Sequence, residues 1–322
     1  MTNIPSEIAT PLPVGPMTTS WLESNLTSEV NKKQWLDEGY VVFRGAFSEN
    51  QINEYNNIVA LARTGVDDGK DEFSFGDRIG QLHQKYPELM EIAANRDLLM
   101  FLKWALDDEP VLFGSLNFDK GSQQEAHIDA IFFWPEPSYS MAGCWIALED
   151  VNQDAGPLFY LPKSHKWPFL FSENLASYKK EFGDLRNEAG LLSEGDPRRA
   201  EIVQKLGSEW IRKLNELAAN FETEPVTLDL KAGDIVFWHS LLAHGGSKTL
   251  NPALSRKSVV FHYIGSKTDL YTYEQFMLYE RSELSSLGAQ PKAGAVFSDR
   301  LNYMKYDYYV TYVNGEQLIH KL

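Results

Sequence analysis

The chain contains 322 residues, of which 43% are apolar and 13% aromatic, so it has ample material for the core of an ordinary globular protein. Its net charge of −15 excludes nucleic acid and anionic membrane surfaces as electrostatic partners, because both bind basic surfaces. The single cysteine, Cys144, excludes an intrachain disulfide or a cysteine zinc cluster, and we expect it to be a small buried side chain.

The first thirty residues contain neither a basic segment nor a continuous apolar run, so no secretory signal is predicted there. No apolar run in the chain approaches the ~18 residues that a membrane-spanning helix needs. Together with the single cysteine, these observations predict a cytoplasmic protein. We expect residues 1–20 to form a flexible arm, because this segment is rich in proline, which denies backbone donors to helices and sheets.

The first predicted elements are a strand and two helices. "GYVVFRGAF", from Gly39, is a β-rich run between glycines, and "SENQINEYNNIVALAR" after it begins with a capping-box pattern formed by Ser48 and Gln51. Residues 88–106 place apolar side chains at helical spacing and contain neither glycine nor proline. They predict a second packed helix.

Beyond residue 111 the sequence consists largely of short apolar runs separated by Gly, Pro, Asp and Asn. The runs are "VLFGSLNF", "AIFFW", "MAGCWIAL", "PLFYLP", "PVTLDL", "GDIVFWHS" and "KSVVFHYIG". Short strands in this pattern predict a sandwich or barrel. Near the end, "KYDYYVTYVNGEQ" predicts one further strand and a turn.

Residues 165–222 interrupt the strands with a charged, mostly helical segment. Asp196 followed by Pro197 suits the start of a helix, with an N-cap and a proline at the first helical position. An apolar stripe follows at helical spacing, formed by Ile202, Leu206, Trp210 and Leu214. Such a stripe favours packing on a core, while its place between two candidate ligand strands leaves a lid as the alternative.

A histidine and an aspartate, His127 and Asp129, lie two residues apart before the aromatic run "IFFW". The pair alone proves little, because with seven histidines and 45 acidic residues about one such match is expected by chance. Alternation along a strand would point both side chains to the same side. Two His and one carboxylate with open positions form the facial triad of non-haem Fe(II) oxygenases, so the pair needs a distant third ligand.

The segment "AGDIVFWHSLLAHGGSKTL" offers His239 and His244 as that third ligand. Five residues separate them, so on a regular strand they would face opposite sides, and we expect only one to bind the metal. His244 is favoured because it stands against Gly245 and Gly246, where backbone can approach a small cosubstrate closely. His239 is then expected to be structural.

Arg256 begins the next predicted strand, one loop after the candidate ligand His244. A guanidinium can bind a carboxylate through two parallel hydrogen bonds, although an arginine at a strand start is most often a solvated surface residue. The aromatic run after Asp129 favours core packing for each member, and we expect that at least one of Phe133 and its neighbour Trp134 contacts substrate.

These features together resemble the phytanoyl-CoA dioxygenase-like family of Fe(II)/2-oxoglutarate oxygenases. The segments that carry the resemblance are "LDEGYVVFRG", "HIDA" at 127–130, "WIALEDVNQDAGPLFYLPKSHK" at 145–166, "AGDIVFWHSLLAHGGS" and Arg256. They follow the order of the family and spread from residue 36 to about 264, so the resemblance covers most of the chain.

The resemblance implies a mainly β fold with flanking helices, in which a double-stranded β-helix (jelly roll) core carries a helical insertion. It implies one oxygenase domain over residues 1–322. It also implies that His127, Asp129 and His244 bind iron. Related halogenases replace the carboxylate with a small residue, so Asp129 points to hydroxylation or another oxidation.

The resemblance also implies a cosubstrate site. Arg256 would pair with the C5 carboxylate of 2-oxoglutarate, and Trp145 would help to wall the cosubstrate pocket. Ser247, in the loop before Arg256, would assist. The cofactors implied are Fe(II), 2-oxoglutarate and O2.

The sequence therefore predicts a dioxygenase that hydroxylates an unactivated C–H of a small-molecule metabolite and releases succinate and CO2. The same site could instead catalyse desaturation, cyclisation or epimerisation. A catalytically silent jelly-roll protein that binds a metal or ligand is the alternative from another class. Substrate identity and oligomeric state are not predicted.

Overall fold

The computed structural model describes residues 28–63, 78–167, 180–221, 223–289, 295–296, 300–313 and 316–322. The arm predicted for residues 1–20 lies outside the described residues. Within the described ranges, no helix combines the length and the apolar character that crossing a membrane requires.

Ten strands of the described residues form one large, mostly antiparallel sheet, and its main path runs β1-β8-β5-β10-β3-β2-β14-β15. These strands are β1 (Tyr40–Phe43), β8 (Ile235–His239), β5 (Met141–Ala147), β10 (Ser258–Gly265), β3 (Pro110–Phe118), β2 (Ile79–Gly80), β14 (Tyr308–Val313) and β15 (Glu316–Lys321). Beside β3, the sheet is extended by β13 (Asn302–Met304) and β12 (Ala295–Val296). Neighbouring strands are mostly distant in sequence, as in a jelly roll.

Two smaller sheets complete the β core. One has the order β7-β6-β9 and the other pairs β11 with β4, and the strands are β7 (Val226–Thr227), β6 (Leu158–Tyr160), β9 (His244–Gly246), β11 (Asp269–Thr272) and β4 (Phe133–Glu136). The 3-10 turns η5 (Gln153–Ala155) and η6 (Ser164–Lys166) flank β6. Tyr160 of β6 packs against Trp238 of β8 in one apolar cluster, so the small sheet covers one face of the large sheet. The predicted double-stranded β-helix is confirmed.

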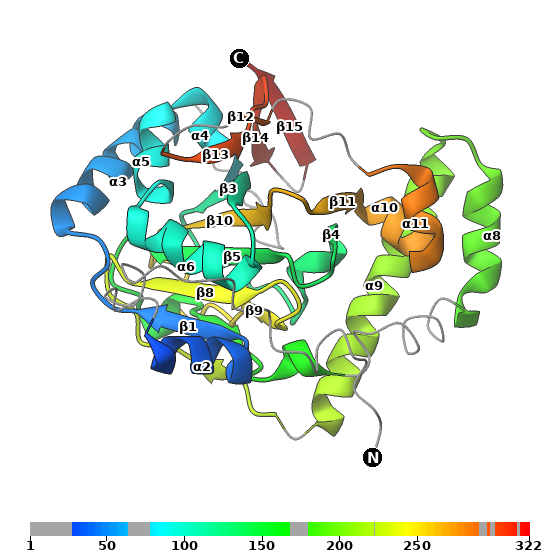
Figure 1. Cartoon of the computed structure of the whole chain (residues 1–322), viewed down its shortest axis with the longest axis horizontal. Coiled ribbons are helices and arrows are strands. Elements are labelled where there is room, and N and C mark those ends of the chain that lie inside the picture. Colours follow the sequence, from blue (N-terminus) through cyan, green and yellow to red (C-terminus); the bar gives the residue numbers. More distant parts are fainter. Residues whose placement is uncertain are drawn as a thin grey trace.

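A layer of helices covers the other face of the large sheet (Figure 1). Its helices are α2 (Glu29–Glu38), α3 (Glu49–Arg63), α4 (Leu82–Lys85), α5 (Met90–Ala93) and α6 (Arg96–Leu106). Side chains of β5 alternate between the two layers, because Cys144 belongs to the same cluster as Phe101 of α6 whereas Trp145 faces the small sheet. Cys144 is fully buried, as predicted.

The structure confirms the predicted helix after Ser48 and divides the one predicted for residues 88–106. Ser48 N donates to Gln51 Oε1 at 3.0 Å, which completes the capping box at the start of α3. The second helix is broken into η3 (Pro87–Leu89), α5 and α6. Asn95 causes the break, because its side chain accepts hydrogen bonds from the N–H groups of Asp97 and Leu98 and so starts a new helix.

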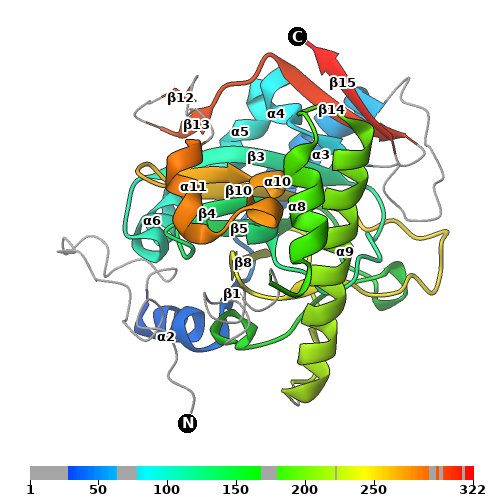
Figure 2. The same ribbon diagram turned by 90° about the vertical axis from the view of Figure 1, so that its right-hand side faces the viewer.

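The predicted insertion contains α8 (Gly183–Leu191) and α9 (Pro197–Asn220), and its residues 168–179 and 222 lie outside the described ranges. Asp196 caps α9, accepting a hydrogen bond from Arg198 N at 2.9 Å. The predicted apolar stripe is buried in one cluster with residues of α10 (Tyr273–Leu278) and α11 (Arg281–Leu287). Figure 2 shows α8 and α9 side by side, next to α10. The stripe therefore serves packing, and movement as a lid stays a prediction.

The C-terminal segment forms a hairpin of two strands, β14 and β15, where the sequence predicted one strand and a turn. The hairpin joins the large sheet through β2, which pairs with β14 on one side and with β3 on the other. It stands at the edge of the molecule near the C-terminus (Figure 1).

Gly143 and Gly114 give a matched test of this packing, because both stand opposite His262 in the sheet register. A Cβ on Gly143 would overlap the ring of Trp238, whereas one on Gly114 would meet its nearest neighbour only at 3.8 Å. We expect Gly143→Ala to lower the free energy of unfolding by about 1–3 kcal/mol and Gly114→Ala to leave it unchanged or slightly higher. Denaturant unfolding of both variants measures this, and equal stabilities would contradict it.

Candidate metal centre

A cavity of about 320 Å³ lies between the large sheet and the three-stranded sheet. Trp145 and Val260 of the large sheet line it, and so do Leu158 and Gly245 of the small one. Six of the residues singled out in the sequence line this cavity: His127, Asp129, His244, Arg256, Trp145 and Phe133. The structure thus gathers side chains from widely separated segments into one space.

The side chains of His127, Asp129 and His244 converge there. One potential ligand atom from each lies within 4.8 Å of the others, and all three residues are buried. Asp129 Oδ1 lies 3.5 Å from His244 Nε2 and 3.8 Å from His127 Nε2. These spacings suit three donors that surround one ion at about 2 Å each.

Backbone pairing holds the two histidines together, since the N–H of each donates to the carbonyl of the other at 2.9 Å. Ile128 between the ligand pair has extended backbone (φ −113°, ψ 140°), so His127 and Asp129 point to the same side.

The predicted strand over residues 130–134 is wrong at its start. Asp129 begins a 3-10 turn, η4 (Asp129–Ile131), and β4 begins only at Phe133.

Both histidines have a fixed tautomer. Nδ1 of His127 lies 2.8 Å from the carbonyl of Glu125, and Nδ1 of His244 lies 2.9 Å from the carbonyl of Leu242. A carbonyl can only accept, so each Nδ1 carries a proton, and Nε2 is the nitrogen of each ring that faces Asp129. This is the ordinary arrangement of an imidazole metal ligand.

The other carboxylate oxygen of Asp129, Oδ2, is held by two donors that the sequence analysis did not single out. Trp238 Nε1 donates to it at 2.6 Å, and His262 Nε2 at 3.3 Å. Gly143 lies between these two residues in the sheet register, and its missing side chain leaves room for the indole. Strand alternation could have assigned His262 to the same face as Val260, but no sequence signal predicts its contact with Asp129.

The charges in the cluster are those that a metal site needs. Burial opposes ionisation of the Asp129 carboxyl, but His244, His262 and the hydrogen bond from His262 hold its pKa well below the usual range. Burial, together with the neighbouring His244, lowers the pKa of His127 to about 3. At neutral pH the cluster therefore contains an ionised carboxylate and a neutral His127 imidazole.

Arg256 and Trp145 lie in the same cavity, next to each other. Arg256 is only 1% exposed, its Nη1 donates to the carbonyl of Gly156 at 3.0 Å, and its guanidinium carbon lies 5.9 Å from the ring centroid of Trp145. Trp145 Nε1 is buried and has no hydrogen-bond partner among the described residues. A buried donor without a partner beside a buried cation fits a bound carboxylate.

Two predicted site residues lie outside the cavity. The N–H of Ser247 donates to the carbonyl of Pro157 at 2.8 Å, and the backbone of Ser247 is thereby tied to the end of β6, away from the cavity lining. Trp134 stacks on Phe276 with ring centroids 4.4 Å apart, and its Nε1 donates to Glu136. The turn η4 sets the phase of β4 so that Phe133, not Trp134, faces the cavity.

Phe133 and Phe132 both line the cavity, and Phe133 is 41% exposed. His239, by contrast, is buried on the other side of β8, where its ring lies 5.8 Å from Trp35 and 5.3 Å from His165. His239 and His244 thus face different sides, as predicted, but they lie on two strands, β8 and β9, and not on one regular strand.

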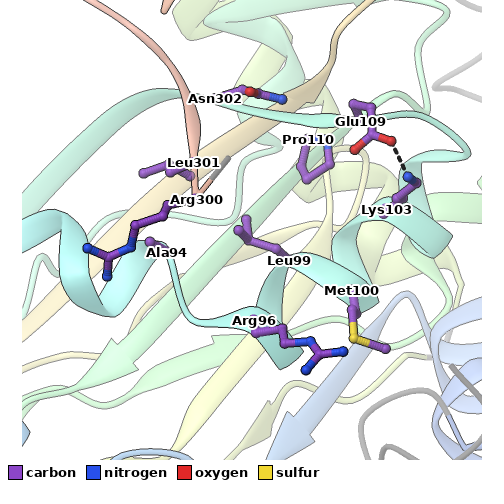
Figure 3. A pocket seen from close by; sticks show the side chains of 10 residues that line it. All are labelled: Ala94, Arg96, Leu99, Met100, Lys103, Glu109, Pro110, Arg300, Leu301 and Asn302. Atoms are coloured by element: carbon purple, nitrogen blue, oxygen red, sulfur yellow. Dashed lines mark hydrogen bonds and ion pairs between the residues drawn. The ribbon is translucent and has the colours of Figure 1, made fainter. Parts of the chain in front are cut away.

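A second hollow, of about 410 Å³, lies against α6 and residues 300–302 (Figure 3). Among its charged lining residues, Lys103 pairs with Glu109, and Arg300 pairs with Glu91, which lies outside the lining. In the part of the chain that the structure describes, the cluster of three potential metal ligands is in the inner cavity. The inner cavity is therefore the candidate site.

A jelly roll with two buried histidines and one carboxylate around an open position is the architecture of non-haem Fe(II) oxygenases. A sequence profile of the phytanoyl-CoA dioxygenase (PhyH) family matches residues 35–258, and the chain belongs to this family. Members of the family are 2-oxoglutarate-dependent non-haem iron oxygenases.

Two curated relatives match parts of the chain. Peroxisomal phytanoyl-CoA dioxygenase of Rattus norvegicus is 26% identical over 144 residues, which are 45% of this chain and 34% of the relative. Phytanoyl-CoA dioxygenase domain-containing protein 1 of Danio rerio is 31% identical over 124 residues, which are 35% of this chain and 43% of the relative. The matched part thus spans less than half the length of either relative.

Solved structures share the fold. The 2-oxoglutarate-dependent epimerase SnoN from nogalamycin biosynthesis superposes with a TM-score of 0.55 at 17% identity, covering 84% of this chain and 95% of SnoN. EctD from S. alaskensis gives a TM-score of 0.54 at 16% identity, covering 86% of this chain and 88% of EctD. At these identities the likeness concerns the fold.

Removing the hydrogen bond that the Trp238 indole donates to Asp129 tests the role of Trp238. We expect Trp238→Phe to weaken Fe(II) binding about tenfold, because a ligand carboxylate loses one of the hydrogen bonds that orient it. Trp134→Phe is the matched control, since it also removes an indole bond to a carboxylate, but outside the cavity. Anaerobic Fe(II) titration of both variants measures this, and equal affinities would count against a positioning role for Trp238.

Proposed function

We propose that this protein is an Fe(II)/2-oxoglutarate-dependent dioxygenase that hydroxylates an unactivated C–H of a small-molecule metabolite, with release of succinate and CO2. The observation that carries the proposal is the buried cluster of His127, Asp129 and His244 in a cavity that also contains the buried cation Arg256. The cytoplasmic location predicted from the sequence belongs to the same proposal.

In this site His127 and His244 would hold Fe(II) through Nε2, and Asp129 through Oδ1. The carbonyls of Glu125 and Leu242 keep the two imidazoles in the required tautomer. When bound, Fe(II) and 2-oxoglutarate supply the oxidising chemistry with O2. The Asp129 carboxylate would take the place that a halide needs, which favours hydroxylation or another oxidation over halogenation.

Arg256 would bind the C5 carboxylate of 2-oxoglutarate. Its burial makes this pairing strong, because little water competes for the guanidinium. Trp145 walls the same end of the cavity, and its Nε1–H, which has no partner among the described residues, would be free to donate to a carboxylate oxygen. Leu158 and Val260 add apolar surface that excludes water.

The substrate would enter beside Phe132 and Phe133. The partly exposed Phe133 makes this the side of the cavity that small molecules can reach. Flat apolar side chains there would orient a C–H of the substrate toward the metal and keep water away from it.

Replacing His239 and His244, one at a time, by glutamine tests which of them binds the metal. Metal-free protein is mixed anaerobically with Fe(II) and 2-oxoglutarate, and the visible charge-transfer band of the chelate is recorded. We expect the band in wild type and in His239→Gln, and none in His244→Gln, because only His244 faces the cluster. A band that survives in His244→Gln would reject this ligand set.

Product analysis separates the proposed reaction from its alternatives. Hydroxylation yields succinate and a product heavier by one oxygen atom. A product that has lost hydrogen would indicate desaturation or cyclisation, and an unchanged mass would indicate epimerisation. Iron binding without succinate formation, under every condition, would favour the silent binding protein.

Arg256→Gln tests the cosubstrate assignment. We expect about 100-fold weaker 2-oxoglutarate binding with little change in Fe(II) affinity, because a buried charge-assisted pair is lost while the metal ligands stay in place. Titrating 2-oxoglutarate against the chelate band measures the first quantity, and Fe(II) titration alone measures the second. Unchanged 2-oxoglutarate affinity would exclude Arg256 from this role.

A further inference from the structure

The cavity is lined by a buried serine, Ser122, that the proposed mechanism does not use. Ser122 is 9% exposed and belongs to residues 119–126, which connect β3 to the ligand pair. The sequence suggested Ser247 as a serine of the cosubstrate site, but the structure ties Ser247 to the end of β6, outside the cavity lining. Ser122 is a serine that does line the cavity.

The start of this segment lies against Arg256. The backbone N–H of Arg256 donates to the carbonyl of Asp119 at 2.7 Å. Gly121 lies so close to Gly156 that a Cβ on Gly121 would come within 2.8 Å of the Gly156 carbonyl oxygen. That oxygen accepts a hydrogen bond from Arg256 Nη1 at 3.0 Å. The segment therefore brings Ser122 to the end of the cavity where the guanidinium lies.

The rest of the segment runs beside β9 toward the metal cluster. Gly246 N donates to the carbonyl of Gln124 at 2.9 Å, and further along the backbones of His127 and His244 pair with each other. Ser122 therefore lies at the Gly246 end of this pairing, and the metal cluster lies at the other end. Two residues of a strand span about 7 Å, which is comparable with the length of a five-carbon acid bound to the metal by one end.

Gly246 leaves the space that the Ser122 hydroxyl occupies. A Cβ on Gly246 would overlap Ser122 Oγ, so the hydroxyl lies where a side chain at position 246 would otherwise begin. Gly246 is opposite Leu158 in the small sheet, and Leu158 also lines the cavity. The missing side chain of Gly246 thus gives the hydroxyl its place at the cavity wall.

We propose that Ser122 is a cosubstrate-binding residue, whose hydroxyl donates a hydrogen bond to the C5 carboxylate of 2-oxoglutarate beside Arg256. The inference rests on the proposed function and adds a binding residue to it. A serine hydroxyl can rotate its proton toward an acceptor, and hydrogen bonds to an ionised carboxylate are stronger than those between neutral groups. Ser122 therefore favours a 2-oxo acid with a second carboxylate over one that ends in a methyl group.

Two 2-oxo acids of equal chain length test this proposal. 2-Oxoglutarate and 2-oxopentanoate share the oxygens that chelate iron, but 2-oxopentanoate has a methyl group in place of the C5 carboxylate. Wild type and Ser122→Ala are mixed anaerobically with Fe(II) and titrated with each acid, and the chelate band reports binding. We expect Ser122→Ala to weaken 2-oxoglutarate binding about tenfold and to leave 2-oxopentanoate binding unchanged, because a methyl group cannot accept a hydrogen bond.

Ser247→Ala is the matched control. It removes the other serine hydroxyl that the sequence suggested for this site, and the structure places that serine outside the cavity lining. We expect Ser247→Ala to bind both acids as wild type does. Fe(II) titration without a 2-oxo acid should give equal affinities for wild type and both variants, which shows that the variants are folded and that their metal cluster is intact.

Three results would overturn the proposal: an unchanged 2-oxoglutarate affinity in Ser122→Ala, an equal loss of affinity for 2-oxopentanoate in that variant, or an equal loss of 2-oxoglutarate affinity in Ser247→Ala. The second result would mean that Ser122 does not act on the C5 carboxylate. Absence of the chelate band with 2-oxoglutarate in wild type would reject the oxygenase itself, and so is distinguishable from failure of the Ser122 assignment alone.

Discussion

The Asp129 carboxylate is buried, and its ionised form depends on the donors around it. Trp238 and His262 hold one of its oxygens, which leaves the other free to face the two imidazoles. These two donors come from β8 and β10, on either side of β5, and they reach the same oxygen only while the three strands keep their register. Gly143, at the centre of that row, has no side chain, so the indole of Trp238 can lie across the sheet there.

Much of the fold could be predicted from the sequence because the strands of the core are buried and bounded by turn residues. The predictions that failed concern places where a single side chain or a local turn decides the structure. Asn95 competes successfully for two backbone N–H groups and breaks an apolar run that looked continuous. The turn that begins at Asp129 interrupts a run whose composition suits a strand. Neither outcome changes the periodicity of the sequence, which is the quantity that the prediction used.

In the candidate site, too, some features could be predicted from the sequence pattern and others could not. The spacing of His239 and His244 predicted that only one of them binds the metal, and the choice of His244 rested on the two glycines that follow it. Trp238 and His262 could not be found in this way, because their contact with Asp129 depends on cross-strand neighbours far away in the sequence. Trp134 was assigned to the cavity by adjacency, but the preceding turn resets the alternation of β4 and turns its indole toward Phe276 instead.

The C-terminal hairpin contributes a residue to the wall of the cavity that contains the metal cluster. Its strand β14 joins the large sheet through the two-residue strand β2, and Tyr312 from this hairpin lines the cavity beyond the segment that matches the family profile, residues 35–258. The histidines and the carboxylate of the metal cluster all lie inside that segment. Tyr312 and the metal cluster therefore come from different stretches of the chain, and a change in the hairpin would alter the wall of the cavity without replacing a residue of the cluster.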